Sequence, residues 1–184
     1  MLSLVVRRPL QPLVAAALTQ EVRLQLRRQL QRAMRAAELT AVQVCLTLAD
    51  DSELHALNLQ YAGEDHATDV LSFAQREPGA SAARPPLPAG LLEPLGDIII
   101  SVETAQRQAA AQGHDLLHEL VHLSVHGLCH LLGYDHATPD EERVMFGYEA
   151  ALREQARGGG RVQRVRAPAL PTPLAEARAA GAVP

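Results

Sequence analysis

Five histidines recur at every fourth position between residues 114 and 130 of this 184-residue chain. On an α-helix of 3.6 residues per turn, each step of four residues rotates by about 40°, so the imidazoles form one slowly turning stripe. Leucines and valines of the same stretch fall on the opposite side of this helix. The stretch therefore predicts a helix that packs an apolar back into a core and presents imidazoles on its front.

A glycine and a further histidine follow this helix. Gly133 comes directly after the last leucine pair, where a glycine can adopt the left-handed conformation that ends a helix. A reversal of the chain here would bring His136 back over His126 and His130. Three neutral imidazoles with an open fourth position form the ligand set of a catalytic zinc, and an i, i+4 pair on a helix supplies two of them. We therefore predict one Zn²⁺ ion bound by His126, His130 and His136.

The remaining histidines of the stripe leave an alternative open. His122 precedes His126 by the same four residues that separate His126 from His130. We prefer the second pair because only that pair adjoins the turn that supplies a third ligand. His122 would then orient a ligand from behind or simply pack against its neighbours. For His114 and His118, which lie upstream, we expect packed or solvated side chains.

Composition restricts the compartment and the partners. The chain carries a net charge of −4 and no lysine, which excludes a lysine nucleophile or Schiff base. An acidic body is a poor nonspecific binder of nucleic acid, so RNA contacts would be local or would use the tail from residue 156, whose net charge is +4. No apolar run approaches about 20 residues, and Arg7, Arg8 and Pro9 interrupt the N-terminal apolar segment. We predict no membrane span, a cytoplasmic location, and core positions for Cys45 and Cys129.

The pattern of apolar residues predicts an α+β (α/β-like) domain. It has a mixed sheet of about four strands surrounded by about five helices, one of them carrying the metal site. The two strands that flank the proline-rich stretch 77–95 could pair as a wide hairpin. Residues 1–155 form this metal-hydrolase domain, and residues 156–184 are predicted to be a disordered tail rich in Arg, Pro, Ala and Gly. The expected strands cover residues 2–6, 42–48, 67–74 and 97–101, and the expected helices cover residues 11–38, 51–61, 102–112, the histidine run and 139–155.

The residue after the first helical ligand separates classes of zinc hydrolase. Zinc peptidases of the H-E-x-x-H type place a general base there, whereas this chain has Gly127. A base would then come from elsewhere, or the metal-bound hydroxide would act alone. Asp135 and Asp69 are candidates, although a turn-forming or strand-end aspartate is an equally good description of each. The sequence leaves the catalytic base unassigned.

The metal motif also carries a family resemblance. Residues 126–136, H-G-L-C-H-L-L-G-Y-D-H, resemble the signature H-G-x-L-H-L-x-G-Y-D-H of the YbeY endoribonuclease family. The resemblance extends over about residues 40–153. Further matching blocks follow in order: Leu57-Asn58, Tyr61, residues 68–73, residues 96–101, and Met145 with Glu149 in the closing helix.

The resemblance implies a zinc-dependent, single-strand-specific endoribonuclease. Such an enzyme acts in ribosomal RNA maturation, notably at the 3′ end of the small-subunit RNA, and in ribosome quality control. Its implied zinc ligands are His126, His130 and His136. The implied partners are single-stranded or precursor rRNA and the small ribosomal subunit. The implied fold is a mixed sheet of about four strands surrounded by helices.

The chain departs from the family pattern in three places. Ala62 stands where the family usually has an arginine after the tyrosine of its L-N-x-x-Y-R block, an arginine associated with holding an RNA phosphate or a developing charge. That role would be lost or would shift to Arg76 or another arginine. Cys129 replaces a leucine in a packed position. The arginine-bearing tail is an addition, and we expect it to supply RNA affinity that the acidic body lacks.

These observations leave an enzyme and a binding protein as competing hypotheses. The leading hypothesis is the zinc-dependent endoribonuclease. The alternative is a metal-stabilised ribosome assembly factor with little cleavage activity, which Ala62 favours. A zinc hydrolase of peptides or small molecules is a weaker third, and Gly127 argues against it.

Overall fold

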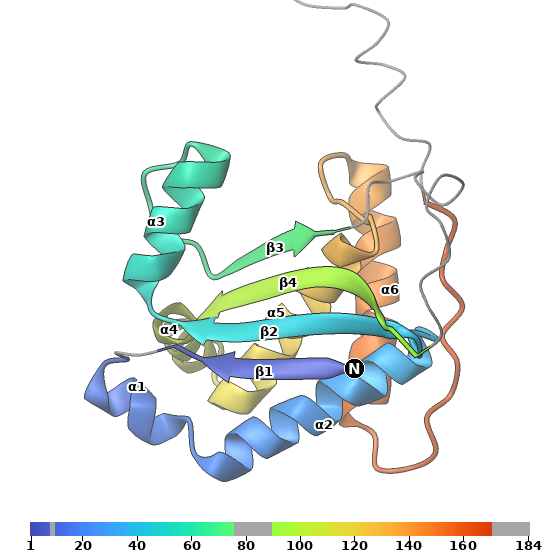
Figure 1. Cartoon of the computed structure of the whole chain (residues 1–184), viewed down its shortest axis with the longest axis horizontal. Coiled ribbons are helices and arrows are strands. Elements are labelled where there is room, and N and C mark those ends of the chain that lie inside the picture. Colours follow the sequence, from blue (N-terminus) through green and yellow to red (C-terminus); the bar gives the residue numbers. More distant parts are fainter. Residues whose placement is uncertain (8–9, 76–89, 171–184) are drawn as a thin grey trace, which may run out of the picture.

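The computed structural model describes residues 1–7, 10–75 and 90–170. Its centre is a four-stranded mixed sheet with the strand order β1-β2-β4-β3 (Figure 1). Strands β1 (Leu2–Val6), β2 (Val42–Ala49) and β4 (Glu93–Ser101) run parallel, whereas β3 (Val70–Ala74) pairs with β4 in the antiparallel direction. The predicted α+β class, the four strands and the pairing of the two strands flanking the proline-rich stretch are confirmed.

Within the described residues, six helices accompany the sheet, one more than predicted. They are α1 (Pro12–Ala17), α2 (Gln20–Ala36), α3 (Asp51–Ala62), α4 (Val102–Gln112), α5 (Leu116–Leu131) and α6 (Pro139–Arg157). The single helix expected over residues 11–38 is wrong, because the chain leaves the helical conformation at Leu18 and Thr19. Leu18 is buried, and the Thr19 hydroxyl accepts a hydrogen bond from Val22 N and so starts α2 anew.

Short polar side chains start the helices around the site. Asp50, Ser101 and Asp115 each accept a hydrogen bond from the backbone amide three residues ahead, in α3, α4 and α5. Thr138 and Glu141 form a reciprocal capping box at α6, with Pro139 in the first turn. These caps place the histidine helix and the following helix where the sequence predicted them.

The histidine helix α5 lies against one face of the sheet. It packs on β3 and β4 and contacts α2, α4 and α6 (Figure 1). Leu46 and Ile98 on the covered face are fully buried, whereas Cys45 and Ile99 on the other face are partly exposed.

Gly127 lets α5 approach the sheet closely. A β-carbon at this position would lie 2.8 Å from Ile98 Cγ2 and 2.8 Å from Ser72 Oγ. The absence of a side chain is therefore a packing requirement where the helix meets β3 and β4. The glutamate of the zinc peptidases could not be accommodated here without separating the helix from the sheet.

The segment after α6 differs from the expectation of disorder from residue 156. The helix continues to Arg157, and residues 158–170 run as an extended segment along α2 and α6 (Figure 1). Val162 and Val165 pack against the hydrophobic core, and Val165 N donates a hydrogen bond to Ala36 O over 2.9 Å. Two apolar side chains, one backbone–backbone bond and further bonds between side chains and backbone thus offset the loss of conformational entropy, which composition alone predicted to keep this segment disordered. The remaining residues, 171–184, lie outside the described part.

Three further predictions concern a membrane span, Arg76 and the boundary of the domain. No helix within the described residues is long and apolar enough to cross a membrane. Arg76, named as a substitute for the family arginine, lies outside the described residues. The division into a domain up to residue 155 and a tail stays a prediction apart from the segment 158–170.

Candidate metal centre

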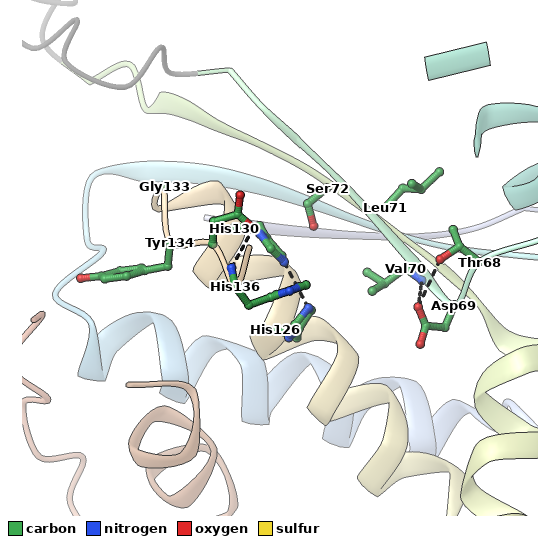
Figure 2. Close-up of a pocket in the computed structure, with 11 residues that line it drawn as sticks. Thr68, Asp69, Val70, Leu71, Ser72, His126, His130, Gly133, Tyr134 and His136 are labelled. Atoms are coloured by element: carbon green, nitrogen blue, oxygen red, sulfur yellow. Dashed lines mark hydrogen bonds between the residues drawn. The ribbon is translucent and has the colours of Figure 1, made fainter. Parts of the chain in front are cut away.

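His126 and His130 occupy successive turns at the C-terminal end of α5, and His136 follows the turn. Their candidate ligand atoms all lie within 4.8 Å of one another, and His126 Nε2 is 3.1 Å from His130 Nε2. The three rings converge on one point beside β3 (Figure 2). Nitrogens bound to one tetrahedral zinc at about 2.0–2.1 Å would lie about 3.3 Å apart, so small side-chain adjustments suffice to bind one ion.

A left-handed glycine produces this convergence. Gly133 has a φ of 90°, and its amide donates to His130 O, which ends the helix. Tyr134 is buried, and its amide donates to Cys129 O, so the chain reverses tightly over the end of α5. The predicted turn is confirmed, and it brings His136 over the two helical histidines.

A buried carboxylate holds His126 from behind. Glu149 of α6 is only 4% exposed, and its Oε2 lies 3.0 Å from His126 Nδ1. With Nδ1–H donating to this carboxylate, the lone pair of Nε2 points toward His130 and His136. This is the carboxylate–histidine arrangement that orients metal ligands in proteins.

The same carboxylate also binds His122 and Arg153. Glu149 Oε1 lies 3.1 Å from His122 Nε2 and 3.2 Å from Arg153 Nη1. Burial alone would raise the pKa of Glu149, but hydrogen bonds from His122 and His126 outweigh burial and lower it to about 2. Glu149 is therefore ionised at neutral pH, and His122 lies behind the candidate ligands, on the far side of this carboxylate.

Sequence reasoning did not assign Glu149 a role, although a signal was present. Met145, Tyr148 and Leu152 form the buried stripe of α6, and Glu149 falls on the same stripe. A carboxylate on the apolar side of a helix is rare unless it is paired, so its position alone indicated a buried partner.

His130 is suited to bind a metal as a neutral imidazole. Burial, followed by repulsion from His126 and His136, lowers its pKa to about 4. A metal ligand must carry a free lone pair, so a histidine that is already neutral releases no proton when it binds an ion. Cys129, by contrast, is fully buried, and burial raises the pKa of its thiol, which fits the predicted core role.

An open pocket of about 570 Å³ adjoins the three imidazoles. One wall is the segment 68–72, which leads into β3, and the opposite wall is the turn Gly133–His136 (Figure 2). His136 is exposed. The candidate ligands are therefore accessible to solvent and to a substrate from the side of the pocket.

The two aspartates considered as bases both line this pocket. Asp69 accepts hydrogen bonds from Val70 N over 2.7 Å and from Gln108 Nε2 over 2.9 Å, so both of its oxygens are engaged. Asp135 is exposed, and its Oδ1 accepts from His136 N over 2.8 Å. Neither geometry identifies a base, and the catalytic base stays unassigned.

The upstream histidines lie away from the convergence. His114 stacks on His118 with ring centroids 4.4 Å apart, and Arg157 Nη1 lies 3.4 Å from His118 Nε2. Glu119 Oε2 lies 3.0 Å from His114 Nε2, at an ion-pair distance without hydrogen-bond geometry. The expectation that His114 and His118 are packed or solvated agrees with these contacts.

A family model described as "Endoribonuclease YbeY" matches residues 14–157 of the chain. Among curated proteins, an endoribonuclease YbeY of Geobacillus kaustophilus is 48% identical over an alignment of 110 residues, and the match covers 56% of this chain and 66% of that protein. One of Brevibacillus brevis is 45% identical over an alignment of 126 residues, and the match covers 65% of this chain and 79% of that protein. The matched part thus spans about two thirds or more of these relatives.

A solved structure supports the fold independently. The solution structure of a Thermotoga maritima protein matches with a TM-score of 0.54 and 22% identity. The match covers 85% of this chain and 89% of that one. At this level of identity the likeness concerns the arrangement of the strands and helices.

Proposed function

Because the chain belongs to the endoribonuclease YbeY family, we propose that it is a zinc-dependent, single-strand-specific endoribonuclease that acts in ribosomal RNA processing. We extend the proposal to the 3′ end of the small-subunit RNA, to ribosome quality control, and to a cytoplasmic protein that meets precursor rRNA on the small ribosomal subunit. The endoribonuclease activity is inferred from the family, and the metal is inferred from this chain's own histidines.

The observation that carries the proposal is the convergence of His126, His130 and His136 beside an open pocket. Nitrogen donors without thiolates or a ring of carboxylates favour zinc among the common metals of hydrolases. Zinc held there would supply a water of pKa about 7 and stabilise negative charge on a phosphodiester oxygen.

The chain's own side chains would position the ion and the RNA. Glu149 keeps the Nε2 lone pair of His126 directed at the ion position. The Ser72 hydroxyl and the Asp135 carboxylate lie on the two walls of the pocket, where they can hydrogen-bond to a ribose or a water. Both side chains would restrict the orientation in which an RNA strand enters the pocket.

An exposed aromatic ring beside the site supports single-strand specificity. Phe146 of α6 is 44% exposed, and its ring centroid lies 6.0 Å from that of His136 and 6.4 Å from that of His126. An unpaired base can stack on such a ring, whereas a base inside a duplex cannot reach it.

One observation favours the assembly factor with little cleavage. Ala62 ends α3 on the surface, and the neighbouring Tyr61 ring packs 5.0 Å from Phe73 of β3, the strand that also lines the pocket. A position so close to β3 suits a side chain that contacts RNA, and alanine offers no charge there. If the missing positive charge at position 62 limits cleavage, Ala62→Arg should raise the rate of RNA cleavage.

The test compares the purified full chain with His130→Ala and with His118→Ala as the matched control. We expect the wild type and His118→Ala to bind one zinc and to cleave single-stranded RNA. His130→Ala should lose more than about 100-fold in zinc affinity, beyond the range for outer-layer partners, and should lose cleavage. Zinc content by mass spectrometry of metals and RNA cleavage on gels provide the readouts.

Two results would contradict the proposal. Cleavage that persists in zinc-free His130→Ala would exclude a metal-dependent reaction at this site. Zinc binding and ribosomal-subunit binding without cleavage, in both the wild type and Ala62→Arg, would leave the assembly factor as the function.

A further inference from the structure

The structure anchors an arginine-bearing segment on α2. Arg32 Nε donates to Gln155 O over 3.0 Å, and Arg32 Nη1 donates to Gly160 O over 2.9 Å. Gln163 N donates to the side chain of Gln155 over 2.9 Å. Together with the bond from Val165 to Ala36, these contacts hold residues 160–165 against α2 and the end of α6.

Valines and arginines alternate in their placement along this segment. Val162 and Val165 pack inward, whereas Arg161, Arg164 and Arg166 are exposed. On α2, Arg28 and Arg35 stand three or four residues from Arg32, so all three fall on the side of the helix that meets the segment. We call the exposed arginines of this surface the basic face: Arg28, Arg35, Arg157, Arg161, Arg164 and Arg166.

The charge of this region is opposite to that of the chain. Residues 20–38 and 153–166 hold ten arginines and three glutamates, a net charge of +7 in a chain whose net charge is −4. Within the described residues, Arg28, Arg35, Arg161 and Arg166 form no ion pair with a carboxylate, while Arg164 pairs with Glu38. Two arginine-rich stretches more than 110 residues apart in sequence thus form one surface with little internal neutralisation.

The segment continues from the basic face to the rim of the metal pocket. The Tyr134 hydroxyl donates to Pro168 O over 2.8 Å, and Leu170 lies beside Gly133. Both Gly133 and Tyr134 line the pocket. Four extended residues from Arg166 to Leu170 span at most about 14 Å, so the basic face begins a short distance from the candidate metal.

We propose that the basic face binds the phosphate backbone of the RNA strand whose neighbouring nucleotides enter the metal pocket. The inference rests on the proposed function for the identity of the polymer, and it adds a second contact surface outside the pocket. Guanidinium groups bind phosphate oxygens through charge-assisted, often bidentate hydrogen bonds. Unpaired arginines on an otherwise acidic protein suit a polyanion, because it gains contacts here and is repelled elsewhere.

The test measures binding of full-length chains to fluorescent single-stranded RNA over a range of salt concentrations. All proteins carry His130→Ala to prevent cleavage, and circular dichroism checks their folding. Arg161→Gln with Arg166→Gln removes two charges from the basic face. Arg7→Gln with Arg107→Gln is the matched control, because both of these arginines are exposed and ion-paired elsewhere in the structure.

The basic-face variant should bind an RNA of about 16 nucleotides more weakly, while an RNA of about 4 nucleotides should bind unchanged, lengths that bracket typical single-strand sites. The slope of log K against log salt should become shallower by about 1.4, at about 0.7 per lost phosphate contact. In the metal-loaded chain without His130→Ala, the same two substitutions should raise KM for the long RNA and leave kcat unchanged.

The outcomes separate the two proposals. Equal binding and equal slopes for the basic-face and control variants, with the long RNA still cleaved by wild type, would overturn the basic face alone. A larger loss of RNA affinity in the control variant than in the basic-face variant would also overturn the basic face. If the wild type neither binds nor cleaves RNA of either length, both proposals fall.

Discussion

The two halves of α5 carry histidines at the same spacing but in different surroundings. In the first half, His122 faces the carboxylates of Glu119 and Glu149. In the second half, His130 faces the imidazoles of His126 and His136. The difference teaches that the i, i+4 repeat alone does not bring three candidate metal ligands together. Neighbouring elements decide, because α6 delivers a carboxylate to one half and the turn after Gly133 delivers a third imidazole to the other.

His126 stands at the junction of the two halves, and Glu149→Gln tests that link. We expect zinc affinity to fall by about 10–100-fold, because a carboxamide has no negative charge to hold both His122 and His126. Competition with a chromophoric chelator measures the affinity. Glu154→Gln, on an exposed position of the same helix, is the control. Equal affinities for the two variants would show that Glu149 does not position His126.

Gly127→Ala tests how closely the second half must approach the sheet. The new β-carbon would lie 2.8 Å from Ser72 Oγ and from Ile98 Cγ2, so we expect a loss of about 1–2 kcal/mol in the free energy of unfolding. Gly147→Ala in α6 is the matched control, since nothing lies within 4 Å of its β-carbon position, and it should gain up to about 1 kcal/mol. Denaturant unfolding measures the free energy of unfolding of both variants. Changes of the same sign in the two variants would refute the steric argument.

His122→Gln should have the smallest effect and sharpens the comparison most. His122 acts only through Glu149, which Arg153 also holds, so zinc affinity should fall by less than about tenfold. In a Glu149→Gln background the substitution should cost nothing further, because the shared partner is already lost. A loss greater than that of Glu149→Gln would make His122 a ligand, the alternative that the sequence left open.

The sequence predicted what depends on local pattern. Gly133 and the i, i+4 histidines act within a few residues, and the structure shows both as expected. The caps at Asp50, Ser101 and Thr138 are equally local in origin. The alternation of apolar residues likewise located the four strands within a few residues of their observed ends.

Features that depend on distant partners were missed. The break at Leu18 divides a helix that periodicity made continuous. Residues 158–170 were expected to be disordered because they mix Gly, Pro, Ala and Arg without an apolar period, yet α2 offers them a backbone hydrogen bond and the core offers apolar contacts. Glu149 reaches His126 across 23 residues, and only its place on a buried stripe indicated a partner.

The three candidate ligands lie within eleven consecutive residues. This short spacing limits how much a bound ion can stabilise the folded protein. An unfolded chain keeps these imidazoles close together and so retains some affinity for zinc, which offsets part of the stabilisation gained by the native state. Raising the zinc concentration should therefore increase the melting temperature less than the native-state affinity alone would predict. If the proposed site binds zinc, the excess affinity of the folded protein would come from Glu149 and the turn, which organise the candidate ligands only after α6 has packed.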